Sequence, residues 1–549
     1  MSQDRLQHLA ETLAAAGTRH AFGVTGSGQS LSLIAALEAR GVAYHPASHE
    51  AAAAMMAGAV TAATGAPAVS ISIKGPGLSN MLPGIAANAF ENRPALSISE
   101  AFGPGVPSYR KHKRLDHGGL LAPVVKGSLT LDRAADLPAL LALAAAEVPG
   151  PVHLDLSDGG AAVAAGPADA ARAADRSAID GAIAAIRAAA RPVIIAGSLA
   201  ARRGYGPLLT VPGVPVFTTA AGKGAVDESL PQAAGVFTGD GKSLTAEATL
   251  IAEADLVVGV GLRNTELLSP KPFGRRTILL DEVDGGLSEG LGGELVVARA
   301  EDVQEVLREL HLVGREWGSD RIRAIDAALR TRLLSAGAWS APAAVDLLNR
   351  PTAWWAANAF TLVADTGSFC TVAEHLWRAG PARSYLGSSN GRYMGTGLPT
   401  AVGAACASAA RSASGTSSPP RPLGALADAR VTPRGAPVVC LVGDGGIRMH
   451  VAELRLAVAE RLPLCVVLMS DGRFGSVACA AGPLAGHRAV GVDGASWWRA
   501  AEAMGCDAVQ VESMTAFGRA LDTWRADGPL FIEAVFEPEA YAAMTKDVR

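Results

Sequence analysis

The chain has 549 residues, too many for a single hydrophobic core, and the usual ~100–200 residues per domain suggest three or four domains. Hydrophobic residues make up 49% and charged residues 18%, as in an ordinary globular protein, and the formal net charge of -4 gives no global sign of binding to nucleic acid or a membrane surface. No apolar run reaches the ~20 residues of a membrane span, and the N-terminus lacks a signal-peptide core. The six cysteines include no CxxC pair, so we interpret them as free thiols of a cytoplasmic protein.

The first part of the chain alternates helical and β-rich runs. Helices are expected at 5–16, 31–37 and 51–64. Strands are expected in AFGVTGSGQS, near Tyr44, and at 68–73, 95–99 and 151–156. This alternation is typical of parallel strands joined by crossover helices, so residues 1–165 are predicted to form one α/β domain.

The rest of the chain repeats this pattern. A small, polar run with Pro and Gly at 158–177 predicts a linker. Strand candidates follow in RPVIIAGS, VPVFTT, ADLVVGVG and RRTILLDEV and, after a junction near 333–343, at 361–364, 438–442, 464–469 and 530–534. The composition of 410–437 cannot pack a core and predicts a flexible surface insertion. We therefore predict an α/β protein with three doubly wound parallel-sheet domains, at 1–165, 176–335 and 345–549, the first and third being alike.

The most informative stretch is VVCLVGDGGIRMHVAELRLAVAERLPLCVVLMSDGRFG. One strand ends in GDG at 443–445, a helix is expected at 452–460, and a second strand ends in SDG at 470–472. Because the strand ends of one parallel sheet meet at its carboxyl edge, Asp444 and Asp471 are expected side by side. Glycines let a phosphate approach the backbone, and paired carboxylates suit Mg²⁺. An isolated GDG is more often a simple turn, but the second acidic turn favours a metal and phosphate site.

This stretch resembles the diphosphate-binding motif of thiamin diphosphate enzymes, in which GDG is followed, after a helix and a strand, by Asn. The resemblance implies thiamin diphosphate and Mg²⁺, with the ion bound by Asp444, by Asp471 and by the backbone carbonyl of Arg473. The chain departs from the pattern because Asp471 stands where the family has Asn, which adds a negative charge beside the diphosphate. The resemblance also implies cofactor contacts from Gly443, Gly445, Gly446, Phe474 and Gly475.

A second motif, SHEAAAAMMAGAVTAATGAPAVSISIKGPGLSN, lies in the first segment. It is similar to the pyrimidine-binding domain of acetolactate synthase and pyruvate decarboxylase relatives, in which a glutamate opens a small-residue helix, as Glu50 does here. The resemblance implies that Glu50 hydrogen-bonds the cofactor's pyrimidine ring and activates it, because a glutamate whose pKa is raised by burial can share a proton. The alternative is a carboxylate that caps the helix.

Two further stretches resemble the same family. SSNGRYMGTGLPTAVGAACA is similar to the segment whose large apolar residue holds the cofactor bent, which is Met394 here, and ADTGSF is similar to the first turn of that domain. Additional contacts to the diphosphate or the rings are expected from Thr366, Gly367, Ser388 and Ser389. The resemblance implies a pyrimidine-binding, a middle and a diphosphate-binding domain, in a homodimer or homotetramer whose active sites lie at the subunit interface.

Basic residues are the candidates for binding the substrate. Relatives carry functional pairs where this chain has YRKHKRLDHGG, and an alignment on flanking residues places His112 and Lys113 at those positions. His112 is a candidate general acid or base, and Lys74 in IKGPG is a candidate for holding a carboxylate. The alternatives are a solvated loop and a surface lysine. If these cations converge with the weaker candidates, the substrate carries extra negative charge; the weaker candidates are His117, His450, Arg392 and Arg448.

The middle segment has only a GxG after a strand, which is a weak dinucleotide signal. Acetolactate synthases bind FAD in this domain and decarboxylases do not, and we favour an empty domain over FAD. The sequence as a whole predicts decarboxylation or carboligation of a 2-oxo acid with thiamin diphosphate and Mg²⁺. A thiamin diphosphate lyase or hydrolase that releases no CO₂, and an inactive cofactor-binding subunit, are the alternatives.

Overall fold

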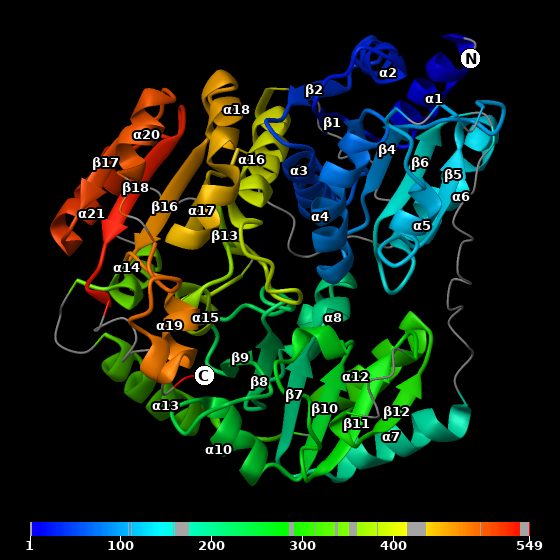
Figure 1. Ribbon diagram of the computed structural model, residues 1–549. Helices are drawn as coiled ribbons and strands as arrows, with labels where there is room; N and C mark the ends of the chain where they lie inside the picture. Colours follow the sequence, from blue (N-terminus) through cyan, green and yellow to red (C-terminus); the bar gives the residue numbers. More distant parts are fainter. Residues whose placement is uncertain are drawn as a thin grey trace.

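Three parallel sheets organise the molecule (Figure 1). The computed structural model describes all residues except 1–2, 108, 111, 158, 160–174, 285–289, 313, 335–338, 351–358, 381–382, 414–434, 493, 495, 539–547 and 549. Each sheet has six strands and is flanked by helices, which confirms the predicted α/β class with three doubly wound domains. In the part of the chain that the structure describes, no helix is long and apolar enough to cross a membrane.

The sheet of the first domain has the strand order β2-β1-β3-β4-β6-β5. Its strands are β1 (His20–Gly23), β2 (Ala43–Pro46), β3 (Val69–Ser72), β4 (Leu96–Glu100), β5 (Ser128–Thr130) and β6 (Val152–Leu156). Its helices are α1 (Gln3–Ala15), α2 (Gln29–Glu38), α3 (Glu50–Thr64), α4 (Pro76–Phe90), α5 (His117–Leu121), the 3-10 helix η1 (Leu131–Asp136) and α6 (Leu137–Ala145).

The middle domain has the strand order β12-β11-β10-β7-β8-β9, which is the order of dinucleotide-binding sheets when it is followed from β9. Its strands are β7 (Pro192–Ala196), β8 (Val216–Thr219), β9 (Ala233–Phe237), β10 (Leu256–Val260), β11 (Arg276–Asp281) and β12 (Glu294–Val297). Its helices are α7 (Arg176–Ala188), α8 (Ser198–Arg202), α9 (Gly206–Leu209), α10 (Ala246–Glu253), the 3-10 helix η2 (Asn264–Glu266), α12 (Ala300–Leu312) and α13 (Ser319–Leu333).

The third domain has the order β14-β13-β15-β16-β18-β17, which is the order of the first domain repeated. Its strands are β13 (Phe360–Ala364), β14 (Arg383–Gly387), β15 (Val438–Gly443), β16 (Leu464–Ser470), β17 (Asp507–Val511) and β18 (Leu530–Val535). Its helices are α14 (Ala341–Leu348), α15 (Ser368–Leu376), α16 (Gly397–Ala413), α17 (Asp444–His450), η4 (Val451–Glu453), α18 (Leu454–Ala459), α19 (Gly475–Ala480), η5 (Gly482–Leu484), α20 (Trp497–Ala503) and α21 (Met514–Thr523).

Two expectations for the third domain are wrong in detail. The insertion predicted at 410–437 is too wide, because the good helix formers at its start extend α16 to Ala413. At its other end Ala436 is buried, and its carbonyl accepts a hydrogen bond from Ser408 Oγ at 2.7 Å; residues 414–434 lie outside the described residues. The helix expected at 452–460 instead starts at Asp444, because β15 runs directly into α17, and it continues through η4 into α18.

Helix α3 lies at the centre of the contact between the first and third domains (Figure 1). Its small side chains are buried almost all round, which is possible because glycines of the neighbouring helices approach its backbone. A Cβ added to Gly84 of α4 would lie 2.2 Å from the carbonyl oxygen of Ala51, and one added to Gly403 of α16 would lie 2.5 Å from that of Met56. The sequence of α3 therefore fixes how the two domains pack.

Candidate active site

Two acidic side chains meet at the carboxyl edge of the third sheet. Strands β15 and β16 are paired in parallel, with Gly443 opposite Met469, so the residues that follow them are neighbours. The carboxylate of Asp444 accepts hydrogen bonds from Ser470 Oγ at 3.0 Å and from the backbone N–H of Asp471 at 2.8 Å. The sequence prediction that Asp444 and Asp471 lie side by side is therefore correct in geometry.

The charges of these two aspartates are poorly compensated. Burial raises the pKa of Asp444, and burial together with the like charge of Asp444 raises the pKa of Asp471 to about 6. A divalent cation between the carboxylates would relieve this repulsion, and hard oxygen ligands are those that Mg²⁺ prefers. The donor set fits the predicted ion, and the backbone of Arg473, the third predicted ligand, is held beside it by its N–H bond to Asp471 Oδ1 at 3.1 Å.

A pocket surrounds these aspartates. A Cβ on Gly445 would lie 2.5 Å from the ring of Phe474 and 2.9 Å from Met394 Sδ, so only glycine lets these two side chains pack against the backbone here. The structure thus brings together eleven of the residues predicted to contact the cofactor, whose role in binding stays a prediction. These residues, which line the pocket, are Thr366, Gly367, Met394, Gly443, Asp444, Gly445, Gly446, Asp471, Arg473, Phe474 and Gly475.

Asp365 organises the pocket and was missed by the sequence analysis. It follows β13, is fully buried, and accepts hydrogen bonds from the backbone N–H groups of Thr366 at 2.8 Å and Gly395 at 3.0 Å. A Cβ on Gly446 would lie 2.0 Å from its carboxylate. Asp365 therefore contacts three segments at once: the turn after β13, the loop that carries Met394, and the start of α17.

The loop that carries Met394 is also held by an ion pair. Arg392, whose backbone has a positive φ of 48°, places Nη1 2.7 Å from Glu374 Oε1 in α15. The hypothesis that Arg392 reaches the substrate is not supported, because its guanidinium is turned into the domain interior toward this buried carboxylate. Its position instead fixes the segment just before Met394.

Ser388 and Ser389 lie apart from the pocket. Ser388 Oγ donates to the carbonyl of Tyr393 at 3.2 Å, and the backbone N–H of Ser389 donates to Glu91 at 3.1 Å. Ser389 lines a different cavity, where the three domains meet. The structure therefore does not bring these two serines together with the aspartates.

Glu50 opens α3 and is 9% exposed. Its side chain is not the helix cap, because His49 Nδ1 accepts the N–H of Ala51 at 3.1 Å, although Glu50 lies in the first turn of α3, where the helix dipole favours a negative charge. Asn80 Nδ2 donates to Glu50 Oε2 at 3.2 Å. Glu453 of the third domain, whose pKa burial raises to about 7, accepts the N–H of His49 at 3.0 Å and holds the start of the helix.

Lys74 is paired rather than free. It follows β3, and its Nζ lies 2.6 Å from Oε2 of the buried Glu100 at the end of β4, while the other Glu100 oxygen accepts Ser30 Oγ at 2.8 Å. The hydrogen bonds and the ammonium outweigh the effect of burial and lower the pKa of Glu100. Lys113 is near this pair, because a Cβ on Gly75 would lie 2.3 Å from its carbonyl oxygen.

The remaining basic candidates do not converge. His112 and Lys113 are exposed on the loop between β4 and α5, and Arg448 is exposed on α17. His117 is buried and pairs with Asp155 at 2.7 Å, in a cluster where His153 also contacts Asp155, so its imidazole is engaged inside the first domain. Burial and the neighbouring His49 lower the pKa of His450 to about 4.

The switch point of the middle sheet is filled by the chain itself. The backbones after β7 and β10 touch, since a Cβ on Gly197 would lie 2.2 Å from the carbonyl oxygen of Gly261. The carboxylate of Glu266 accepts the N–H of Ser198 at 3.2 Å and Thr219 Oγ1 at 2.8 Å. A dinucleotide pyrophosphate in the usual place would have to displace this carboxylate. The residues present therefore do not fit FAD at that place.

The chain belongs to the thiamine pyrophosphate enzymes. Models of that family match the N-terminal TPP binding domain at residues 5–105, the central domain at 179–310 and the C-terminal TPP binding domain at 365–534. The match includes Glu50 and both aspartates, and with the relatives below it makes the chain a thiamin diphosphate-dependent enzyme of the 2-oxo acid decarboxylase and carboligase kind.

Relatives of two named activities match most of the chain. It is 28% identical to a "probable 2-ketoarginine decarboxylase" of Pseudomonas aeruginosa, over 86% of this chain and 82% of that protein. It is 26% identical to the large subunit of acetolactate synthase isozyme 3 of Escherichia coli, over 84% and 81%. It is 25% identical to the acetolactate synthase of Bacillus subtilis, over 85% and 81%.

Proposed function

We propose that the chain uses thiamin diphosphate and Mg²⁺ to decarboxylate a 2-oxo acid, and that it releases the remaining fragment or joins it to an acceptor carbonyl. The pairing of two under-compensated carboxylates, Asp444 and Asp471, in a pocket that glycines also line carries this proposal. Bound thiamin diphosphate supplies a nucleophilic carbon and accepts the electrons left behind when CO₂ departs.

The residues of this chain then have separate tasks. Asp444, Asp471 and the carbonyl of Arg473 would hold the ion, and the glycines that line the pocket would let the diphosphate approach the backbone. Met394, whose Sδ packs against Gly445, would support the cofactor's rings. Glu50 would hold a proton at the pyrimidine ring, and Asn80 fixes the orientation of its carboxylate.

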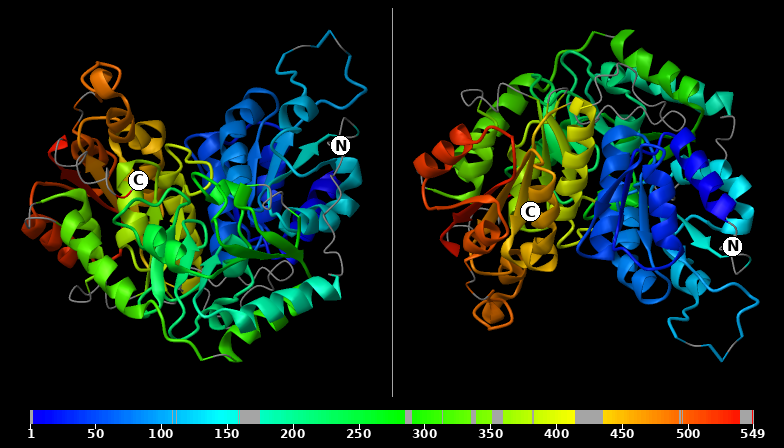
Figure 2. Two further views of the ribbon diagram at one scale, coloured as in Figure 1. Left: turned by 90° about the horizontal axis from the view of Figure 1, so that it is seen from below. Right: turned by 90° about the horizontal axis from the view of Figure 1, so that it is seen from above.

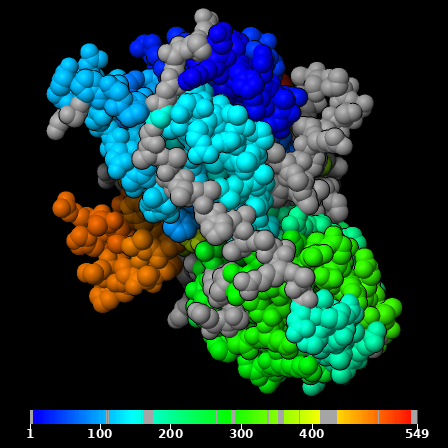
Figure 3. Space-filling model, turned by 90° about the vertical axis from the view of Figure 1, so that its right-hand side faces the viewer, coloured from blue at the N-terminus to red at the C-terminus, as the bar shows by residue number. Residues whose placement is uncertain are grey.

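We further infer that two copies of the chain share each active site. Glu50 is absent from the residues that line the pocket of its own chain, all of which come from the third domain. The loop between β4 and α5 (light blue) and the segment around α19 (orange) project from the same face of the molecule (Figures 2 and 3). A second copy facing this side would bring its Glu50 and its basic loop toward the pocket.

The part of the active site that binds the substrate is expected at the carboxyl edge of the first sheet. Lys74 and Glu100 form a pair of opposite charges there, so the local field does not by itself favour a substrate with extra negative charge. One donor of Lys74 is used by Glu100, and the others are available for the carboxylate of a 2-oxo acid. Release of CO₂ from a panel of 2-oxo acids distinguishes this proposal from a lyase or hydrolase that does not decarboxylate.

The variant Glu50→Gln tests the mechanism. Turnover is expected to fall at least about 100-fold, because the amide cannot exchange the proton that the carboxylate holds. Binding of thiamin diphosphate, measured by isothermal titration with Mg²⁺ present, should persist, and Glu11→Gln, at an exposed glutamate of the same domain, should leave both quantities unchanged. Turnover like that of the wild type in Glu50→Gln would refute the mechanism.

A further inference from the structure

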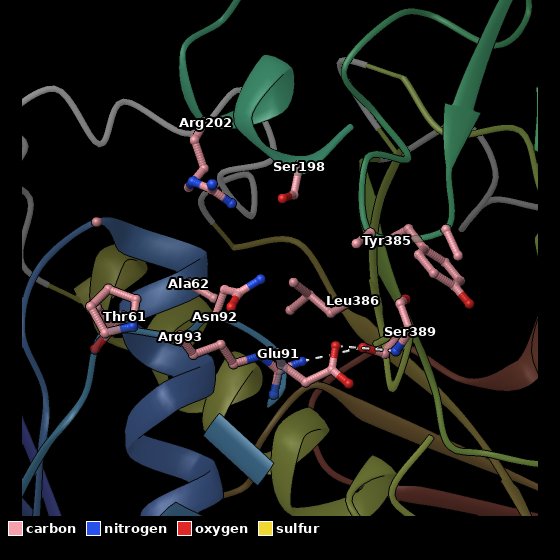
Figure 4. A pocket seen from close by; sticks show the side chains of 15 residues that line it. Thr61, Ala62, Glu91, Asn92, Arg93, Ser198, Arg202, Tyr385, Leu386 and Ser389 are labelled. Atoms are coloured by element: carbon pink, nitrogen blue, oxygen red, sulfur yellow. Dashed lines mark hydrogen bonds between the residues drawn. The ribbon is translucent and has the colours of Figure 1, made fainter. Parts of the chain in front are cut away.

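A second cavity lies where all three domains meet (Figure 4). The first domain contributes the C-terminal end of α3 and residues 91–94 after α4, the middle domain contributes the start and end of α8 with residues 220–221, and the third domain contributes residues 385–387 and 389. It shares no lining residue with the pocket around Asp444. Neither the cofactor nor the proposed substrate accounts for this cavity.

Two buried donors face this cavity without a partner. Ser198 is 3% exposed, and its Oγ makes no hydrogen bond within the described part of the chain; the same is true of Asn92 Nδ2. In Figure 4 the Ser198 hydroxyl and the Asn92 amide point into one space beside Arg202. Buried polar groups are rarely left unpaired, because the loss of water costs free energy. Their convergence therefore indicates a missing acceptor.

The neighbouring guanidinium adds positive charge. Arg202 directs Nε and Nη2 to the carboxylate of Glu147 at 3.0 and 2.7 Å, and no described residue bonds its Nη1. Glu147 also accepts Arg263 Nη2 at 3.1 Å, so it is shared between two guanidiniums. Burial alone would raise the pKa of Glu147, but Arg202 and Arg263 outweigh it and lower that pKa to about 2. Arg263 is also paired with Asp281, so the two guanidiniums share two carboxylates, and what Arg202 offers the cavity is its unbonded Nη1 donor.

The cavity is connected to the loop that carries Met394. Asn92 follows Glu91, whose carboxylate accepts the backbone N–H groups of Ser389 at 3.1 Å, Asn390 at 3.1 Å and Gly391 at 3.0 Å. These three residues lead directly into Arg392 and Met394. A ligand that holds Asn92 would therefore restrain the anchor of this loop.

We propose that this cavity binds an oxyanion, a carboxylate or a phosphate group, through Ser198 Oγ, Asn92 Nδ2 and Arg202 Nη1, and that the bound anion tightens the Met394 loop. The hydrogen-bond donors and the guanidinium favour an anionic acceptor, because the carboxylate of Glu91, which also lines the cavity, is already bonded to the backbone N–H groups of residues 389–391. The binding site stands on its own contacts, and only its effect on the cofactor rests on the role proposed for Met394.

Anion binding is tested on the enzyme saturated with thiamin diphosphate and Mg²⁺, so that the diphosphate pocket is filled. Inorganic phosphate is titrated in one arm and acetate and pyruvate in another, with thermal unfolding and calorimetry as measurements. At least one of the two chemistries should bind saturably to the wild type. Ser198→Ala and Asn92→Gly should weaken this binding about tenfold or more, since each removes one hydrogen bond to a charged group.

These variants are chosen to keep the fold. Ser198→Ala removes an unpaired hydroxyl and leaves the N–H bond to Glu266, and glycine readily adopts the positive φ of 52° at Asn92. The melting temperature without anion should therefore stay close to that of the wild type. Lys242→Met, which removes an exposed cation of the middle domain, controls for general charge effects and should bind the anion normally.

The coupling is read from the affinity for thiamin diphosphate. The anion should raise that affinity in the wild type and not in Ser198→Ala, and by linkage the cofactor should raise the affinity for the anion equally. No saturable binding of phosphate, acetate or pyruvate, or equal binding by the wild type and both variants, would overturn the site. Binding at the site without any change in cofactor affinity would overturn the coupling.

Discussion

Asp471 is the residue in which this chain departs from the diphosphate motif, and its environment predicts the consequence. Its folded pKa of about 6 exceeds the ordinary value of 3.8, so the folded protein binds this proton more tightly than the unfolded chain. Without metal, its contribution to stability is therefore lost as the pH rises from about 4 to about 6. Above this range the ionised pair opposes folding.

The variant Asp471→Asn should remove this opposition. Without metal at pH 8, its free energy of unfolding should exceed that of the wild type by on the order of 1–3 kcal/mol, since one pKa unit corresponds to about 1.4 kcal/mol. With Mg²⁺ and thiamin diphosphate it should gain less stability than the wild type, because one negative ligand is missing. Denaturant unfolding at pH 4 and pH 8, with and without the ligands, measures both effects.

An exposed aspartate provides the control for this comparison. Asp507→Asn, on β17, should change neither the stability without metal nor the gain from Mg²⁺. If Asp471→Asn is no more stable than the wild type without metal, the two carboxylates do not repel one another as described.

Residues joined by local motifs could be predicted from the sequence, and residues defined by long-range partners could not. Asp444, Asp471 and Glu50 each come after a strand and lie in a recognisable sequence motif. The order of the strands then predicts which residues are their neighbours in space. Asp365 and Glu453 gain their importance from backbone N–H groups distant in the sequence, at Gly395 and His49. No pattern in the sequence predicts such a contact. The ion pairs of Lys74 with Glu100 and of Arg392 with Glu374 were missed for the same reason, and the second of them turns Arg392 away from the substrate role considered for it.

At the scale of elements, the strands that the sequence analysis missed share one property. β5, β9, β12, β14 and β17 all lie at the edges of their sheets. β12 and β17 are largely exposed or half-buried, so their sequences need no continuous hydrophobic run. β5, β9 and β14 are mostly buried, but they are short and include polar residues or glycine. The central strands are buried and were predicted from their runs of apolar residues, as in β3, β7, β10, β15 and β16. The dinucleotide-like order of the middle sheet could not be predicted, because two of its strands were missed.

The space around two helical glycines, one in α16 and one in α7, predicts opposite effects of the substitution of glycine by alanine. Gly403→Ala should destabilise the protein by more than about 1 kcal/mol, because the new Cβ would lie 2.5 Å from a backbone oxygen of α3 that cannot move alone. Gly181→Ala, inside α7, should stabilise it by about 0.5–1 kcal/mol, since its Cβ meets nothing closer than 4.0 Å and alanine is the better helix former. Chemical denaturation measures both, and a gain in Gly403→Ala would show that the domains separate easily.

At the scale of the whole molecule, the first and third domains share one architecture but carry different candidate site residues. The first and third sheets have the same strand order, and the chain places Glu50 in one and the paired aspartates in the other. Within a single chain, α3 and α16 join these domains through their buried faces. This packing buries the faces of α3 and α16 inside the chain. The projecting loop and the α19 segment stay exposed on one side of the molecule (Figure 2). The proposed site that combines Glu50 with the aspartates would therefore take its two parts from different chains.

Mixing two inactive variants tests this assembly. In Glu50→Gln the pocket for the diphosphate is intact, and in Asp444→Ala the glutamate is intact. If each site takes Glu50 from one chain and Asp444 from another, a mixed dimer has one wholly intact site and one that carries both changes. Random exchange makes half of the dimers mixed, so activity should recover to about a quarter of that of the wild type. Each variant alone, and a mixture kept from exchanging subunits, should stay inactive. If both variants exchange subunits, as labelled chains would show, and the mixture recovers no activity, each site is built within one chain.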